Sequence, residues 1–355
     1  MLSNWASFSC IGCATGGEKI LTTSFPTIGP MARRKSTKRK TQKVQRDLIF
    51  QVPSGTHYID TAQALSMVNR KLFKQGHVFG YEGAEIYFTA SGAAVINQVQ
   101  LQTAGDTWPV HNAHVKGNAL WNQMNQLVLE DNPSVEGKWA DYKVFLDTAH
   151  RAYFFGPGNL IPRDGTGAVY LNGEWNYSTY VLPQHEVDPA TGVPIAADET
   201  QSHLVGPDVG VAGAWQSIGL VNAYQESRAT VQALAPNVPA GMSDSFFNLL
   251  TDSGSQEPEL ADVIEGANDA APYDLLNYPG GAVNAGNTLV TEEMVATVGS
   301  PTGLTGPFIA QCGLIKIINS AFSVTGEPVT APTLTFRLRL MAGKYKGVAA
   351  IPMGQ

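Results

Sequence analysis

The chain has 355 residues, of which 43% are hydrophobic and only 15% are charged, with 36 glycines and 21 prolines. This composition excludes an intrinsically disordered chain. Ordinary soluble domains carry about 25% charged residues, so the low value predicts a turn-rich β protein whose surface is partly covered by neighbouring copies. No apolar run reaches the ~18 residues of a membrane span. Residues 1–25 lack a secretory pattern, so we expect synthesis in the cytosol or nucleus.

The formal net charge of −7 is distributed unevenly along the chain. Residues 31–46 contain no acidic residue and eight basic ones: Arg33, Arg34, Lys35, Lys38, Arg39, Lys40, Lys43 and Arg46. Between Asp164 and Ile315, by contrast, Arg228 is the only basic residue among many Asp and Glu. The basic segment near the N-terminus is therefore suited to bind an anion, whereas the acidic middle of the chain would repel one.

Two segments are expected to precede the folded domain. Residues 1–30 are weakly apolar and nearly uncharged, and Met31-Ala32-Arg33 resembles a natural protein start, so 1–30 is interpreted as an extension with Met31 as a candidate initiator. The basic segment 31–46 has no apolar periodicity, and we expect it to be a disordered arm that orders on a partner. The folded domain is then expected over 47–355.

The first ordered elements are predicted directly after the arm. Residues 48–52 are β-rich and end at the turn formers Pro53-Ser54-Gly55, and residues 60–74 have helical spacing behind a capping Asp60. Further strands are predicted at 84–89, 95–101, 143–148, 169–171 and 177–182, with a helix inserted at 119–129.

The region 184–285 is acidic and rich in Pro and Gly, which predicts long loops forming an outward elaboration. Within it, 217–223 has strand character, and 243–250 and 258–264 have short helical patterns. Strands return at 289–298, 309–324 and 334–340, the last in strict alternation. The predicted fold class is an all-β antiparallel sandwich with short helical insertions.

The basic arm is the strongest functional signal. A flexible cationic segment neutralises phosphates and releases counterions without fixed geometry, so its eight basic residues predict salt-sensitive, sequence-independent nucleic-acid binding. A nuclear-import signal is a compatible second role, and a solubilising tail is the alternative.

Other candidate sites have weaker patterns. Cys10 and Cys13 have metal or redox spacing, but a structural zinc site needs four ligands. A second candidate is a cluster whose carboxylates could hold a hard cation, with a solvated acidic loop as the alternative: His185, Glu186, Asp188, Asp198, Glu199 and His203. Its spacing matches no cation-binding loop with a defined order of ligands. No motif of nucleophilic, zinc-protease or phosphate-loop chemistry is present, so we expect neither catalysis nor a metal or cofactor. Trp108, Trp121, Trp139 and Trp175 are interpreted as core or interface anchors.

Three stretches resemble capsid proteins of small circular, Rep-encoding single-stranded DNA viruses. They are YIDTAQALSMVNRKLFKQG at 58–76, ALWN at 119–122 and DYKVF at 141–145, and the basic start before a β-rich body is similar as well. The resemblance spans about 31–150; the middle of the chain is unmatched, and residues 1–30 depart from the pattern.

The resemblance implies a single jelly roll that assembles into a homo-oligomeric icosahedral shell, with the arm turned inward onto single-stranded DNA. It also implies a virion location, with assembly in the host nucleus or cytoplasm and a nuclear-import receptor as a further partner. Arg70, Lys71 and Lys74 are hypothesised to extend the inner basic surface, against the alternative of a solvated helix face. Competing hypotheses are a non-capsid nucleic-acid-binding accessory protein and a lectin-like β-sandwich.

Overall fold

The computed structural model describes most of the compact unit Lys43–Gln355. The described residues are 44–88, 95–137, 139–182, 198–211, 214–228, 278–284, 286–296 and 302–354. The predicted helical patches at 243–250 and 258–264 lie outside them, as do all residues of the predicted arm before Val44.

The first sheet is antiparallel and has the strand order β1 (Asp47–Val52), β14 (Leu334–Leu340), β3 (His77–Phe88) and β10 (Thr302–Leu304). The short strands β11 (Phe308–Ala310) and β16 (Ala350–Pro352) also pair with β3. In β14 the apolar side chains, including Phe336 and Leu338, are buried, while Arg337 and Arg339 point to the other face. This alternation is the period of a strand with one face on the core, as the sequence predicts.

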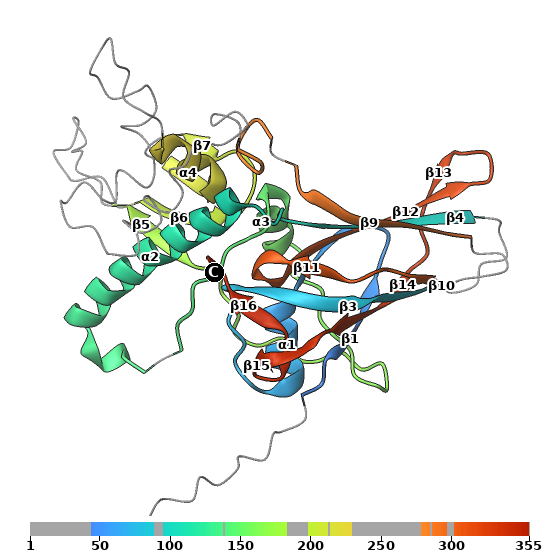
Figure 1. The fold of residues 1–355 in the computed structure, drawn as a ribbon, viewed down its shortest axis with the longest axis horizontal. Helices are drawn as coiled ribbons and strands as arrows, with labels where there is room; N and C mark the ends of the chain where they lie inside the picture. The colour runs from blue at the N-terminus through green and yellow to red at the C-terminus, as the bar shows by residue number, and fades with distance from the viewer. Residues whose placement is uncertain are drawn as a thin grey trace, which may run out of the picture. The chain divides into compact units, whose positions relative to one another are not determined.

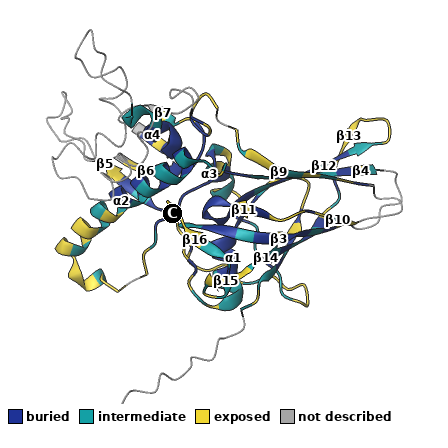
Figure 2. Cartoon of the chain, viewed as in Figure 1, coloured by how far each residue is buried: buried dark blue, intermediate teal, exposed yellow. Residues whose placement is uncertain are grey.

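The second sheet is also antiparallel. Its order is β13 (Pro328–Val329), β12 (Leu314–Ser323), β4 (Val95–Thr103) and β9 (Thr288–Ala296), with β2 (Gly55–Asp60) pairing with β12. Side chains from the two sheets share one core, and among them Phe50, Ile86 and Phe336 meet Val99 and Ile317. The facing sides of both sheets are accordingly buried (Figure 2). The prediction of an antiparallel β-sandwich is thus confirmed.

The strand pairing is nested along the chain. β1 pairs with β14, β2 with β12, β3 with β10 and β11, and β4 with β9. In Figure 1 the blue β1, the first strand of this set, runs beside the red β14, its last strand. The innermost strands of the set, β4 and β9, are partners too.

Helix α1 (Thr61–Asn69) connects β2 to β3. The Asp60 side chain accepts a hydrogen bond from the Gln63 backbone N–H at 3.1 Å, so the predicted cap is confirmed. The helix ends earlier than predicted, because Arg70 adopts a left-handed conformation with φ 51°. Gly76, the predicted stop, lies beyond this end.

A long insertion between β4 and β9 holds the other α-helices of the described residues. It contains α2 (Trp108–Asp131), the short helix η1 (Pro133–Val135), α3 (Thr148–Phe154) and α4 (Leu220–Ser227). A second short helix, η2 (Gln311–Gly313), precedes β12. The predicted helix at 119–129 is only the C-terminal half of α2, which has 24 residues and is not a short insertion. Leu120, Tyr142, Ile218 and Tyr224 belong to a second core cluster, separate from the one between the sheets.

The insertion also contains a third sheet, most of which lies in the region 184–285 predicted as loops. Its order is β5 (Thr179–Leu182), β6 (Asp198–His203), β8 (Ala214–Gly219) and β7 (Val209–Val211), and β6 and β8 pair in parallel. The predicted strand at 177–182 is confirmed by β5, whereas the one at 217–223 is corrected, because the chain turns from β8 into α4 at Gly219. Residues 198–203, 209–211 and 214–227 thus have regular structure within that region.

Two predicted strands are wrong. Residues 143–148 form no strand, and only Phe145 makes an isolated bridge, to His203; within 169–171, Val169 bridges Arg163. The apolar character of 143–148 reflects burial rather than pairing, because Val144 and Phe145 are fully buried in different core clusters. The Val144 N–H donates to Gln75 Oε1, and the Phe145 N–H donates to the Ser202 carbonyl. These hydrogen bonds take the place of those that a strand would make in a sheet.

Candidate nucleic-acid interface

Of the eight predicted nucleic-acid-binding residues, the structure describes Arg46. The other seven, Arg33, Arg34, Lys35, Lys38, Arg39, Lys40 and Lys43, lie outside the described residues. Arg46 Nη1 lies 3.0 Å from Glu82 Oε1 and donates to the Leu340 carbonyl, and the Leu340 N–H donates back to the Arg46 carbonyl. Arg46 is therefore anchored at the edge of the first sheet, and DNA binding by all eight residues remains a prediction.

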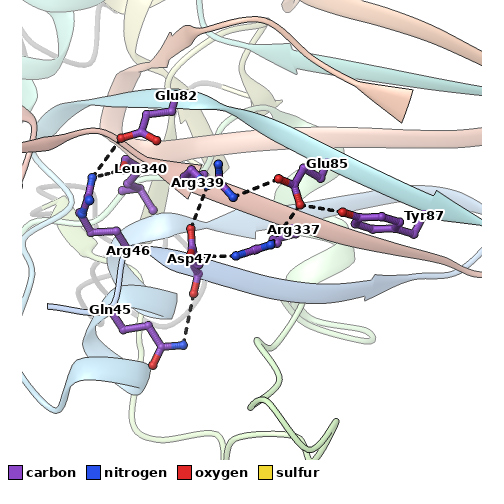
Figure 3. A network of polar contacts seen from close by, with 9 residues as sticks. All are labelled: Gln45, Arg46, Asp47, Glu82, Glu85, Tyr87, Arg337, Arg339 and Leu340. Carbon is purple, nitrogen blue, oxygen red and sulfur yellow. Dashed lines mark hydrogen bonds and ion pairs between the residues drawn. The ribbon is translucent and has the colours of Figure 1, made fainter. Parts of the chain in front are cut away.

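The outer face of the first sheet carries a network of four charged side chains (Figure 3). Arg337 lies 3.1 Å from both Asp47 and Glu85, and Arg339 lies 3.2 Å from Asp47 and 3.0 Å from Glu85. A hydrogen bond from Tyr87, together with the two arginines, lowers the pKa of Glu85. Two cations and two anions alternate, so this face has little net charge to offer a polyanion.

A second group of cations lies where α1 ends. We call Arg70, Lys71, Lys74 and Lys346 the arm-root patch. Lys346 directly follows β15 (Ala342–Tyr345). Lys346 Nζ donates to the Leu72 carbonyl, and the Lys74 N–H donates to the Tyr345 hydroxyl at 2.9 Å. Two segments that are far apart in the sequence are thus joined into one basic surface.

The N-terminal end of the described chain is fixed beside this patch. The Gln45 N–H donates to Asn69 Oδ1 at 2.8 Å, and Asn69 Nδ2 donates to the Gln45 carbonyl at 3.0 Å. Val44 packs on Gly347, where a Cβ would lie only 2.8 Å from Val44 Cγ2. The chain therefore enters β1 between the end of α1 and the turn after β15.

The main acidic neighbour of the patch is weakly placed to neutralise it. Asp141 Oδ1 lies 3.9 Å from Lys74 Nζ, and the carboxylate is largely buried while Lys74 is largely exposed. Burial raises the pKa of Asp141. Burial and the neighbouring Lys74 lower the pKa of Lys346, which reflects the crowding of like charges.

A buried polar cluster centred on Asp60 holds the second sheet to the insertion. Gln75, Trp175 and Tyr177 each donate to Asp60 Oδ2, at 2.9, 3.0 and 3.1 Å. Burial raises the pKa of Asp60 even though these donors favour its ionised form. The carboxylate is saturated by protein donors, so this cluster serves the fold and leaves no oxygen to act on a substrate.

The four tryptophans are placed largely as predicted. Trp175 is buried, and Trp108 and Trp121 pack against the second core cluster. Trp139 is partly exposed, with Lys143 Nζ 4.2 Å from its ring centroid.

The described residues of the acidic cluster are not grouped as ligands. His203 is buried, with its ring nitrogens bonded to Ser217 Oγ at 2.7 Å and the Pro207 carbonyl at 3.0 Å. Within the described ranges, no group of three His, Cys, Asp or Glu residues could hold a metal ion. Cys10, Cys13, His185, Glu186 and Asp188 lie outside those ranges.

No family model, curated protein or solved structure matches this chain. Among the described residues no helix is long and apolar enough to cross a membrane. The features of the chain that bear on function are therefore its strand arrangement, its charge distribution and the arm-root patch.

Proposed function

We propose that this chain is a structural subunit, not an enzyme, that assembles with copies of itself into a closed icosahedral shell. The basic arm packages single-stranded DNA inside that shell. The observation that carries the proposal is the nested strand pairing of the sandwich.

The proposed fold is a jelly roll. When a long antiparallel ribbon rolls up, its strands separate into two facing sheets of four, and each strand keeps its ribbon partner. The orders β1-β14-β3-β10 and β2-β12-β4-β9 match this expectation, and β14–β3 and β12–β4 are the contacts that the rolling adds. Jelly rolls are common in viral capsids, although lectins and cupins also use them.

Two further observations favour a shell over a lectin-like module. The basic arm leads directly into β1, so a polyanion-binding segment is attached to the sandwich itself. The insertion exposes large apolar side chains, among them Leu171 at 84%, Phe155 at 61% and Leu127 at 60%. These side chains are available for burial against another subunit, and they would mark an interaction surface where they form one contiguous patch.

Size-exclusion chromatography with negative-stain microscopy tests the proposal, with the ratio of nucleic-acid to protein absorbance measured before and after nuclease. We expect uniform shells that retain protected nucleic acid. A small species that binds nucleic acid without forming particles would favour the accessory protein. A small species that binds none would favour the lectin-like module.

A further inference from the structure

We propose that the arm-root patch is a fixed binding surface for the phosphates of single-stranded nucleic acid. The inference rests on the proposed function and adds a second contact to it, on the folded body instead of the arm. Because exposed ammonium and guanidinium groups of the patch would meet the backbone, binding is expected to be independent of base sequence.

The first support is the local charge. Four cations come together from the end of α1 and from the turn after β15, and neither residues 61–76 nor residues 328–354 contain an acidic residue. Asp141 contributes one long ion pair to Lys74. The patch therefore keeps a net positive charge.

The second support is availability. On the sheets, Arg46, Arg337 and Arg339 each have an acidic partner within 3.2 Å. Lys316 is paired as well, with Asp147. Arg70 and Lys71 make no ion pair within the part of the chain that the structure describes. Phosphates can approach these two residues without displacing a carboxylate.

The third support is backbone conformation. Arg70 and Lys346 have φ of 51° and 50°, in the left-handed region that glycine and asparagine adopt most easily. In the described ranges, one other non-glycine residue has a positive φ. A solvated helix face does not require long basic side chains at two such positions, whereas a phosphate-binding surface gives them a role.

The fourth support is position. Gln45 and Asn69 fix the start of the described chain next to the patch. A strand held by the preceding basic residues is therefore kept close to the patch, which raises its effective concentration there.

The left-handed backbone at Arg70 and Lys346 allows both cations to be removed with little effect on the fold. Arg70→Asn combined with Lys346→Asn removes two cations at positions where asparagine fits the backbone, so folding should be preserved. A matched control, Arg151→Gln with Arg163→Gln, removes two cations from the insertion, away from the patch.

The test is fluorescence anisotropy of labelled oligo-dT with the full chain over a range of salt concentrations. The slope of log affinity against log salt is negative, and each lost phosphate contact on a single strand reduces its magnitude by about 0.7. The slope of the patch variant should therefore be smaller in magnitude than that of wild type by about 1.4. The control should keep the wild-type slope. Thermal unfolding should show that the patch variant still folds cooperatively, because the preference of asparagine for the left-handed backbone offsets part of the loss of the Lys346–Leu72 hydrogen bond.

The outcomes separate this inference from the proposed function. Wild-type particles that package DNA, together with an unchanged slope in the patch variant, would overturn the patch and leave the shell intact. A reduced slope in a chain that forms no particles would support the patch and contradict the shell. Failed assembly with an unchanged slope would identify the patch as a subunit contact and overturn the inference.

Discussion

Lys316 and Asp147 form an ion pair with an N–O distance of 3.0 Å that joins the second sheet to the insertion. Lys316 lies on β12, and Asp147 caps α3 by accepting from the His150 N–H at 2.7 Å. Tyr58 and Asn287 also donate to this carboxylate. Asp147 therefore fixes the start of α3 against two strands and the approach to β9.

Lys316→Met should be strongly destabilising. It leaves the mostly buried Asp147 carboxylate without its cation, and such a loss typically costs about 3–5 kcal/mol. Denaturant unfolding of unassembled subunits measures the change. Adding Asp147→Asn should recover part of the loss, because it removes the uncompensated charge. A single variant within 1 kcal/mol of wild type, as is typical of exposed pairs, would contradict this account.

The network on the first sheet should matter much less. Arg337→Gln leaves Arg339 bridging Asp47 and Glu85. These side chains are partly exposed, so we expect a loss below about 1 kcal/mol that diminishes further in high salt. Oligo-dT affinity should not change, because the network is already neutral; a clear loss of affinity would place DNA on this face.

Tyr177→Phe tests the buried cluster around Asp60. The hydroxyl donates to Asp60 and accepts from Asn159 Nδ2 at 2.9 Å, so the variant leaves a buried donor with one partner fewer. A loss of about 1–3 kcal/mol is expected from urea unfolding. Tyr170→Phe serves as the control, since that side chain is more exposed, and its stability should match wild type.

Acid should destabilise the subunit through its buried histidines. Burial lowers the pKa of His114 to about 3 and the pKa values of His150 and His203 to about 4. The unfolded chain, with histidine pKa values near 6.5, then binds more protons than the folded chain, so stability falls as pH drops from about 6.5 towards 4.

His114→Leu should reduce this acid sensitivity. Both ring nitrogens of His114 are buried without a hydrogen-bond partner, so an apolar replacement removes no bond. Between pH 6 and pH 4 the slope of unfolding free energy against pH should fall by up to about 1.4 kcal/mol per unit. An unchanged slope in urea titrations would show that His114 does not contribute.

Deleting residues 31–43 should greatly reduce DNA retention while leaving assembly intact. The deletion stops before Val44, Gln45 and Arg46, whose contacts belong to the folded unit. Particles of the deletion variant should show an absorbance ratio much closer to that of protein alone than wild-type particles do. Normal packaging at physiological salt would contradict a role for the arm.

Local sequence patterns predicted the sandwich because its strands alternate or carry β-branched residues, as in β14, and because Asp60 has the spacing of a cap. They missed β6, whose sequence DETQSH reads as an acidic loop and becomes a strand only through pairing with β5 and β8. They also shortened α2, where Gly117 reads as a break. A Cβ at Gly117 would lie 2.6 Å from the Tyr142 hydroxyl, so close packing requires the glycine.

The candidate site was predictable only in part. Arg70, Lys71 and Lys74 stand out beside the α1 segment, but no spacing connects them with Lys346. The contacts of Lys346 with Leu72 and of Lys74 with Tyr345 arise from tertiary structure alone. Charge groups Arg46 with the arm, and no sequence pattern indicates its pairing with Glu82 at the edge of the sheet.

Charge-detection mass spectrometry of nuclease-treated protein tests the central claim most directly, because it weighs intact particles and their contents together. We predict one narrow high-mass population equal to an icosahedral number of 37.9 kDa subunits plus a mass of protected single-stranded DNA. A distribution confined to monomers and small oligomers, with no nucleic-acid mass, would contradict the account.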